Sequence, residues 1–157
     1  MWEALEQTGW VQTVGNTGWM YVTVSVIHYL TMFWFIGSIA IMDLRIVGVA
    51  ARRRSVMEVA GQVFPWAWIG LVLAVSSGFV MFAPFAGDWA PDPVFHIKLT
   101  LILLGFVFAL LVRLGVPRWA SAAQMPMAAK IVALTSLLLW ILTILCASEI
   151  PGREGLG

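Results

Sequence analysis

The sequence has few of the residues on which secreted domains and soluble enzymes depend. It holds one cysteine, Cys146, so an intramolecular disulfide and a CxxC metal or redox motif are both excluded. Charged residues make up only 11% of the 157 residues, the net charge is +1, and no basic stretch carries interleaved aromatics, which excludes a typical nucleic-acid surface. The dinucleotide-binding, P-loop, zinc-protease and serine-hydrolase motifs are also absent.

Apolar residues are present in excess. They form 61% of the chain, whereas soluble domains contain roughly 45–50%, so lipid must cover the surplus. Four apolar runs each reach the roughly 20 residues that a helix needs to cross a bilayer. The sequence therefore predicts an all-α, integral membrane four-helix bundle. It forms one domain over residues 1–157, with helices at about 18–47, 56–85, 93–114 and 126–150.

Local signals mark the ends of these helices. Gly48 is a plausible stop for the first, and residues 55–58 fit the S-x-x-E capping box before the second. Asp92 and Pro93 are typical of an N-cap and a first helical position. Pro117, two residues after a glycine, is expected to end the third helix.

Basic residues predict the orientation. The loop at about 86–94 has two aspartates and no basic residue, whereas the two loops at about 48–55 and 115–126 carry basic residues within them or at their edges. These basic residues are Arg45, Arg52, Arg53 and Arg54 for the first loop and Arg113, Arg118 and Lys130 for the second. By the positive-inside rule the basic loops are cytoplasmic and both termini face outward, in a multi-pass protein of the bacterial inner (cytoplasmic) membrane. Asp43 and Arg45 are expected to form an ion pair at the cytoplasmic end of the first helix.

His28 is the most informative residue for function. It lies within the apolar run 20–42, which contains no charged residue, and an ionisable group at such depth marks a functional site by default. Residues at helical spacing around it form a polar and aromatic stripe that should face the bundle interior. The members of this stripe are Tyr21, Ser25, Thr31, Met32 and Phe35.

The first functional hypothesis is a b-type haem. His28 would be one axial ligand, and His96, at the start of the third helix, a candidate second one, with ligation by His28 alone as the fallback. Lys98 lies about 200° around the helix from His96, so only one of the two can point inward. Flat apolar walls are expected from Phe33, Trp34, Phe35, Phe79 and Phe82.

Two other chemistries stay open. Copper could be bound by soft sulfur ligands beside the histidines; these ligands are Met20, Met32, Met81 and Cys146. Alternatively His28 could transfer protons while Lys98 binds an anionic group. A subunit without a cofactor is a further possibility. The expected partners are the lipid bilayer and, in addition, other membrane subunits or a second copy, but no nucleic acid.

Several segments resemble an uncharacterised family of four-helix bacterial membrane proteins. That family carries a histidine in the first helix, a D-L-R…G end, a P-W…G second helix and a D-P-x-F-x-x-K third helix. The matching segments here are residues 28–48, 64–78 and 92–99, with the fourth helix matched at 134–140. The resemblance implies the fold and no established activity.

A weaker resemblance is to the HemJ-type protoporphyrinogen oxidases. Their histidine followed by W-F-x-G is matched by His28 and residues 34–37, and their H-x-K-L segment by residues 96–99. The resemblance implies that His28 and Lys98 are functional positions. The L-P-R-L-F segment of that family is replaced here by residues 41–45. The CopD-type copper-resistance proteins share a similar H…W-x-G helix, which implies copper as an alternative.

Overall fold

The protein is an all-helical bundle in the computed structural model, which describes residues 2–152 and their side chains to residue 147. Four long helices form its body: α3 (Gly18–Val47), α4 (Val56–Phe82), α6 (Pro93–Ala120) and α7 (Met127–Gly152). No strand occurs among the described residues. The four helices are long and apolar enough to cross a membrane. Their outward faces carry many exposed large apolar side chains, and the exposure of so much apolar surface to water would be unfavourable.

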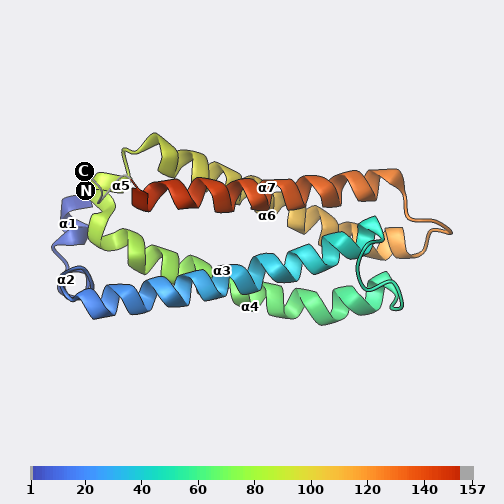
Figure 1. Cartoon of the computed structure of the whole chain (residues 1–157), viewed down its shortest axis with the longest axis horizontal. Coiled ribbons are helices and arrows are strands. Elements are labelled where there is room, and N and C mark those ends of the chain that lie inside the picture. Colours follow the sequence, from blue (N-terminus) through green and yellow to red (C-terminus); the bar gives the residue numbers. More distant parts are fainter. Residues whose placement is uncertain (1, 153–157) are drawn as a thin grey trace.

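The long helices form two hairpins that lie side by side (Figure 1). One hairpin pairs α3 with α4 and the other pairs α6 with α7, and the hairpins meet mainly where α3 packs against α7. The end of the bundle that holds the connections 48–55 and 121–126 is called the loop end below. The opposite end, which holds the N-terminus and the connection from α4 to α6, is called the cap end.

Short helices that the sequence analysis did not predict cover the cap end. They are α1 (Trp2–Glu6), α2 (Gly9–Asn16), the 3₁₀ turn η1 (Ala83–Phe85) and α5 (Ala86–Trp89). Glu6 Oε1 accepts a 2.7 Å hydrogen bond from the Gly87 amide, and the Trp2 ring meets Phe82 edge-on at 5.5 Å between centroids. These contacts fasten the N-terminal segment to the segment that follows α4.

Most of the predicted end signals are confirmed. Gly48 ends α3 in the left-handed conformation at φ 91°, the full capping box over residues 55–58 is present, and the Asp92 side chain accepts from the Val94 amide at 2.8 Å. The predicted stop at Pro117 differs, because α6 runs on to Ala120. A proline there removes only one amide donor within the last turns of the helix, where a lost bond disrupts little of the helix beyond it.

The expected ion pair between Asp43 and Arg45 is not formed. Residues two apart on a helix point about 200° away from each other. Arg45 turns to the connection and donates two hydrogen bonds, of 2.9 Å and 2.7 Å, to the Arg54 carbonyl oxygen. Asp43 instead points into the bundle and is fully buried.

The hydrophobic core occupies the half of the bundle nearer the loop end. Its members come from all four long helices and interlock closely there; they are Phe35, Ile39, Met42, Ile46, Val56, Val59, Ala60, Phe64, Ala67, Ala109, Val112, Val116, Ala129, Ala133 and Trp140. Phe35 and Trp140 are the core residues nearest the cap end, and their rings meet edge-on at 4.8 Å between centroids. Beyond this pair of rings the bundle is hollow.

Candidate functional site

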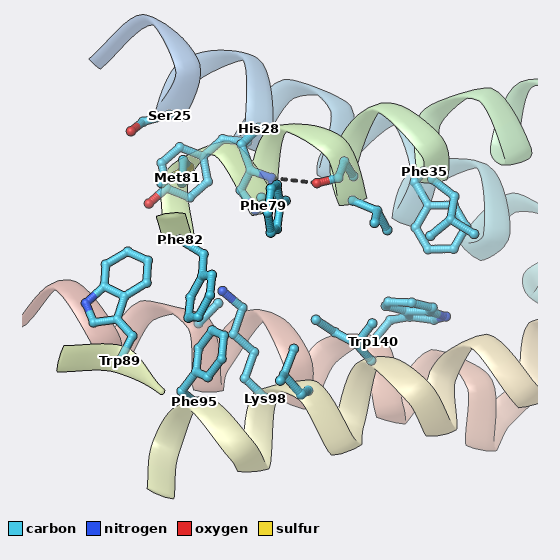
Figure 2. A pocket seen from close by; sticks show the side chains of 18 of the residues that line it. Ser25, His28, Phe35, Phe79, Met81, Phe82, Trp89, Phe95, Lys98 and Trp140 are labelled. Carbon is cyan, nitrogen blue, oxygen red and sulfur yellow. Dashed lines mark hydrogen bonds between the residues drawn. The ribbon is translucent and has the colours of Figure 1, made fainter. Parts of the chain in front are cut away.

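A cavity of about 430 Å³ lies in the half of the bundle nearer the cap end. Its volume falls within the range of small-molecule sites, which is roughly 300–1,000 Å³. Figure 2 shows it between the α3–α4 hairpin and the α6–α7 hairpin, with Phe35 and Trp140 closing one end and Trp89 at the other. Its walls are mostly aromatic and aliphatic side chains, with His28 and Lys98 as the basic groups among them.

His28 is held in one orientation by two acceptors on α4. Its Nδ1 lies 3.0 Å from the Ala74 carbonyl oxygen and 3.1 Å from Ser77 Oγ. A carbonyl can only accept, and the Ser77 hydroxyl already donates to the Leu73 carbonyl at 2.7 Å, so Nδ1 carries the proton. This tautomer leaves Nε2 with a free lone pair. Hydrogen bonding of one ring nitrogen to a backbone carbonyl is typical of histidines that bind a metal through the other nitrogen.

A glycine makes room for the His28 ring. A Cβ atom at Gly78 would lie 2.9 Å from His28 Cε1, so any larger residue would push the ring aside. One and two turns before it, Ala74 and Gly70 continue the small-residue face of α4, and a Cβ at Gly70 would lie 3.2 Å from the Phe35 backbone nitrogen. The sequence indicates this seam only as helix packing; the structure shows that it also sets the position of His28.

Lys98 reaches the same cavity from α6. Its ammonium points toward the side of the cavity where His28 lies, beside Phe82 (Figure 2). Among the described side chains no carboxylate pairs with Lys98, and a cation in so apolar a setting is costly without an anion beside it. The cavity is therefore suited to a molecule that brings its own anionic group.

The other predicted site residues divide between the cavity and its surroundings. Tyr21, Ser25 and Phe35 line the cavity with His28. Thr31 is buried next to it, where its hydroxyl donates to the His28 carbonyl at 3.0 Å and to the preceding turn of its own helix. His96 is exposed and does not line the cavity. The structure thus brings His28 and Lys98 together and leaves the second histidine outside.

The aromatic walls match the sequence prediction in part. Phe35, Phe79 and Phe82 line the cavity, whereas Phe33 and Trp34 point outward and are 64% and 45% exposed. Three aromatic residues that helical spacing did not predict complete the walls from α5, α6 and α7. They are Trp89, Phe95 and Trp140. No helical period in one segment could have found them, because each comes from a different helix.

The sulfur ligands proposed for copper do not gather at one place. Met81 lines the cavity, but Met32 does not, and the Cys146 thiol donates to the Val94 carbonyl at 3.6 Å. Among the side chains that the structure describes, those of residues 2–147, no group of three or more histidine, cysteine, aspartate or glutamate residues could hold a metal ion. A metal in this cavity would depend on His28 and on the ligands that it brings itself, as a haem iron does.

Comparison with known proteins shows the family of the chain. The sequence pattern described as "Family of unknown function (DUF6644)" matches residues 2–150. The chain belongs to this family. No curated protein and no solved structure matches the chain. The DUF6644 match confirms the predicted membership of an uncharacterised family, and no comparison supports a link to the protoporphyrinogen oxidases or the copper-resistance proteins.

Proposed function

We propose that this DUF6644 protein holds a b-type haem in its cavity and has an electron-transfer role, alone or as a subunit of a larger membrane complex. The observation that carries the proposal is His28, whose protonated Nδ1 is fixed by Ala74 and Ser77 and whose Nε2 is left to bind iron. Lys98 would pair with a carboxylate of the ligand, and the aromatic walls would contact its flat faces. A bound haem would supply one-electron redox chemistry.

The location follows from charge and composition. Four helices are suited to spanning a membrane. Basic residues gather at the loop end, with Arg52, Arg53 and Arg54 in one connection and Arg118 in the last turn of α6 before the other. We propose that the loop end faces the cytoplasm of a bacterial cell and that the cap end faces outward. The cavity would then open in the outer half of the inner membrane.

The two histidines of the chain provide a matched test. The protein is purified from cells supplied with a haem precursor, and reduced-minus-oxidised spectra are recorded for the wild type, His28→Ala and His96→Ala. The proposal expects haem bands in the wild type and in His96→Ala, because His96 lies outside the cavity. His28→Ala should lose them while it still folds. A wild type without haem bands, or bands that survive in His28→Ala, would contradict the proposal.

Lys98 tests the anionic group of the ligand. Lys98→Met removes the charge and keeps the length of the side chain, whereas Lys98→Arg keeps the charge. Loss of a charge-assisted contact of about 1.4 kcal/mol corresponds to about tenfold weaker binding. Haem titration should therefore show about tenfold weaker binding for Lys98→Met and near-normal binding for Lys98→Arg. Equal haem affinities of Lys98→Met and Lys98→Arg would show that the charge of Lys98 does not contribute to binding.

A second candidate function is oxidation of a porphyrinogen, as in the HemJ-type enzymes. It is favoured by one observation: His28 and Lys98, the two positions that the resemblance implies, line the same cavity. Expression in a bacterial strain that lacks this oxidation step tests it. Growth restored by the wild type but not by Lys98→Met would support the enzyme, and failure of the wild type to restore growth would remove this candidate.

A further inference from the structure

A second polar site lies in the core, away from the cavity walls described above. Asp43 on α3 is 0% exposed, and so is Ser136 on α7. The Ser136 side chain lies beside the Asp43 carboxyl, yet among the described residues neither carboxyl oxygen nor the Ser136 hydroxyl has a hydrogen bond of good geometry. A fully buried carboxyl without a basic partner is rare, and within a span it indicates function.

Several charged groups near the loop end make contacts with residues other than Asp43. None of them makes an ion pair with Asp43 among the described side chains. Their contacts are instead as follows: Arg45 with the Arg54 carbonyl, Glu58 with Ser55, and Arg113 with the rings of Phe64 and Trp68. Met42 and Ile46, which are one residue before and three residues after Asp43 on α3, belong to the hydrophobic core. An ionised carboxylate here would be uncompensated, at a cost of several kcal/mol in so apolar a core.

Asp43 lies near the loop end of α3, on the side of Ser136 away from the cavity. It lies four residues before the end of α3 at Val47, which is roughly 6 Å at 1.5 Å per residue. In the other direction, Trp140 is one helical turn beyond Ser136, lines the cavity, and has a buried Nε1 with no partner among the described residues. Asp43, Ser136 and Trp140 therefore form a row of polar groups without hydrogen-bond partners among the described residues. The row runs from near the loop end to the end of the cavity that Trp140 closes.

We propose that Asp43 and Ser136 form a proton-binding site, in which Asp43 carries a proton that exchanges with water at the loop end. A neutral carboxyl both donates and accepts, so it can hydrogen-bond to Ser136 without a counter-ion. Membrane carboxyls of this kind serve as relays in proton-moving proteins. The proposal does not depend on what occupies the cavity.

Infrared spectroscopy of the reconstituted full chain tests the site. The chain has three aspartates, Asp43, Asp88 and Asp92, so carbon-13 labelling of aspartate restricts the signal to these groups. The wild type should show the carbonyl stretch of a protonated carboxyl, and this band should shift when the water is replaced by deuterium oxide under native conditions. Absence of the band, as for an ionised Asp43 beside a bound cation, would overturn the proposal. A band that never shifts in deuterium oxide would do so as well.

Matched variants assign the band. Asp43→Asn should remove it completely, whereas Asp88→Asn should leave it unchanged, because Asp88 is exposed. Ser136→Ala should keep the band and move its frequency, since the carboxyl loses its neighbouring hydroxyl. If Asp43→Asn does not fold, Ser136→Ala and the labelled wild type still decide the question. A band that persists in Asp43→Asn, or one whose frequency Ser136→Ala leaves unmoved, would contradict the assignment.

Discussion

The two halves of the bundle are built from the same four helices and differ in how these helices meet. Near the loop end, side chains such as Ile39 and Met42 are at most 1% exposed and interlock with residues of the other helices. Near the cap end, the hairpins enclose a cavity, and residues such as Val75 and Phe79 line it while remaining more than half exposed. One half is filled and the other is hollow.

This difference indicates that the half near the loop end mainly stabilises the bundle and that the half near the cap end is suited to binding. The filled half joins residues of all four long helices, and stability within one protein is commonly uneven, with binding regions among the less stable parts. The hollow half then relies on a few exact contacts, above all those between His28 and α4.

The largest expected difference is in stability. Ile39 lies in the filled half at 1% exposure, whereas Ile102 lines the cavity. Ile39→Ala creates a new void among packed neighbours and should lower the free energy of unfolding by about 2–5 kcal/mol. Ile102→Ala only enlarges a space that already exists and should cost less than about 1 kcal/mol. Equilibrium unfolding in mixed micelles measures both, and equal losses would contradict the division into two halves.

The second prediction concerns the glycine beside His28. Gly78→Ala forces a Cβ to within 2.9 Å of the His28 ring, and overpacking of this kind costs about 1–3 kcal/mol. The variant should melt at a lower temperature and bind haem poorly. Gly37→Ala is the control, since nothing lies within 4 Å of its Cβ position. Normal haem binding by Gly78→Ala would show that the orientation of His28 is not critical.

The third prediction separates two neighbouring serines. Ser77→Ala removes one of the two acceptors of His28 Nδ1 and leaves the Ala74 carbonyl in place, so the loss should be about 1 kcal/mol, or roughly fivefold in haem affinity. Ser76 is exposed and its hydroxyl donates to its own helix, so Ser76→Ala should bind haem as the wild type does. Indistinguishable affinities for the two variants would argue against Ser77 as a positioning residue.

The smallest expected effect is at the cap end. Glu6→Ala breaks the hydrogen bond to the Gly87 amide, which is exposed and should be worth about 0.5–1 kcal/mol. Loss of this hydrogen bond should increase the rate of haem release by no more than a few-fold. Glu3 is exposed, and Glu3→Ala serves as the control. Stopped-flow transfer of haem to an acceptor protein measures the rates; slower release from Glu6→Ala would contradict the role of this contact.

The sequence predicted the long helices well because their signals are local. Gly48, the capping box at residues 55–58 and Asp92 act within one turn of the chain, and each was found where expected. The placement of His28 toward the interior also followed from a single-helix pattern. The N-terminal helices and α5 were not predicted, because their positions depend on contacts between distant segments, such as that of Glu6 with Gly87.

The composition of the cavity could be predicted only in part. Tyr21, Ser25 and Phe35 share a helix with His28, so helical spacing places them together. Which residue of α6 faces the cavity is decided by the rotation of that helix against the others, and spacing could say only that His96 and Lys98 exclude each other. The structure points Lys98 into the cavity and leaves His96 exposed. The burial of Asp43 was missed for the same reason, because it depends on how α3 faces α7.

The central claim is that the Nε2 atom of His28 faces the cavity as the ligand of a haem iron, and chemical rescue tests it most directly. His28→Gly removes the ring and leaves a space beside Gly78 that free imidazole can enter. The account predicts that purified His28→Gly loses its haem bands and that added imidazole restores them at the wild-type positions. A folded His28→Gly protein that keeps the bands without imidazole, or never regains them with it, would contradict the account.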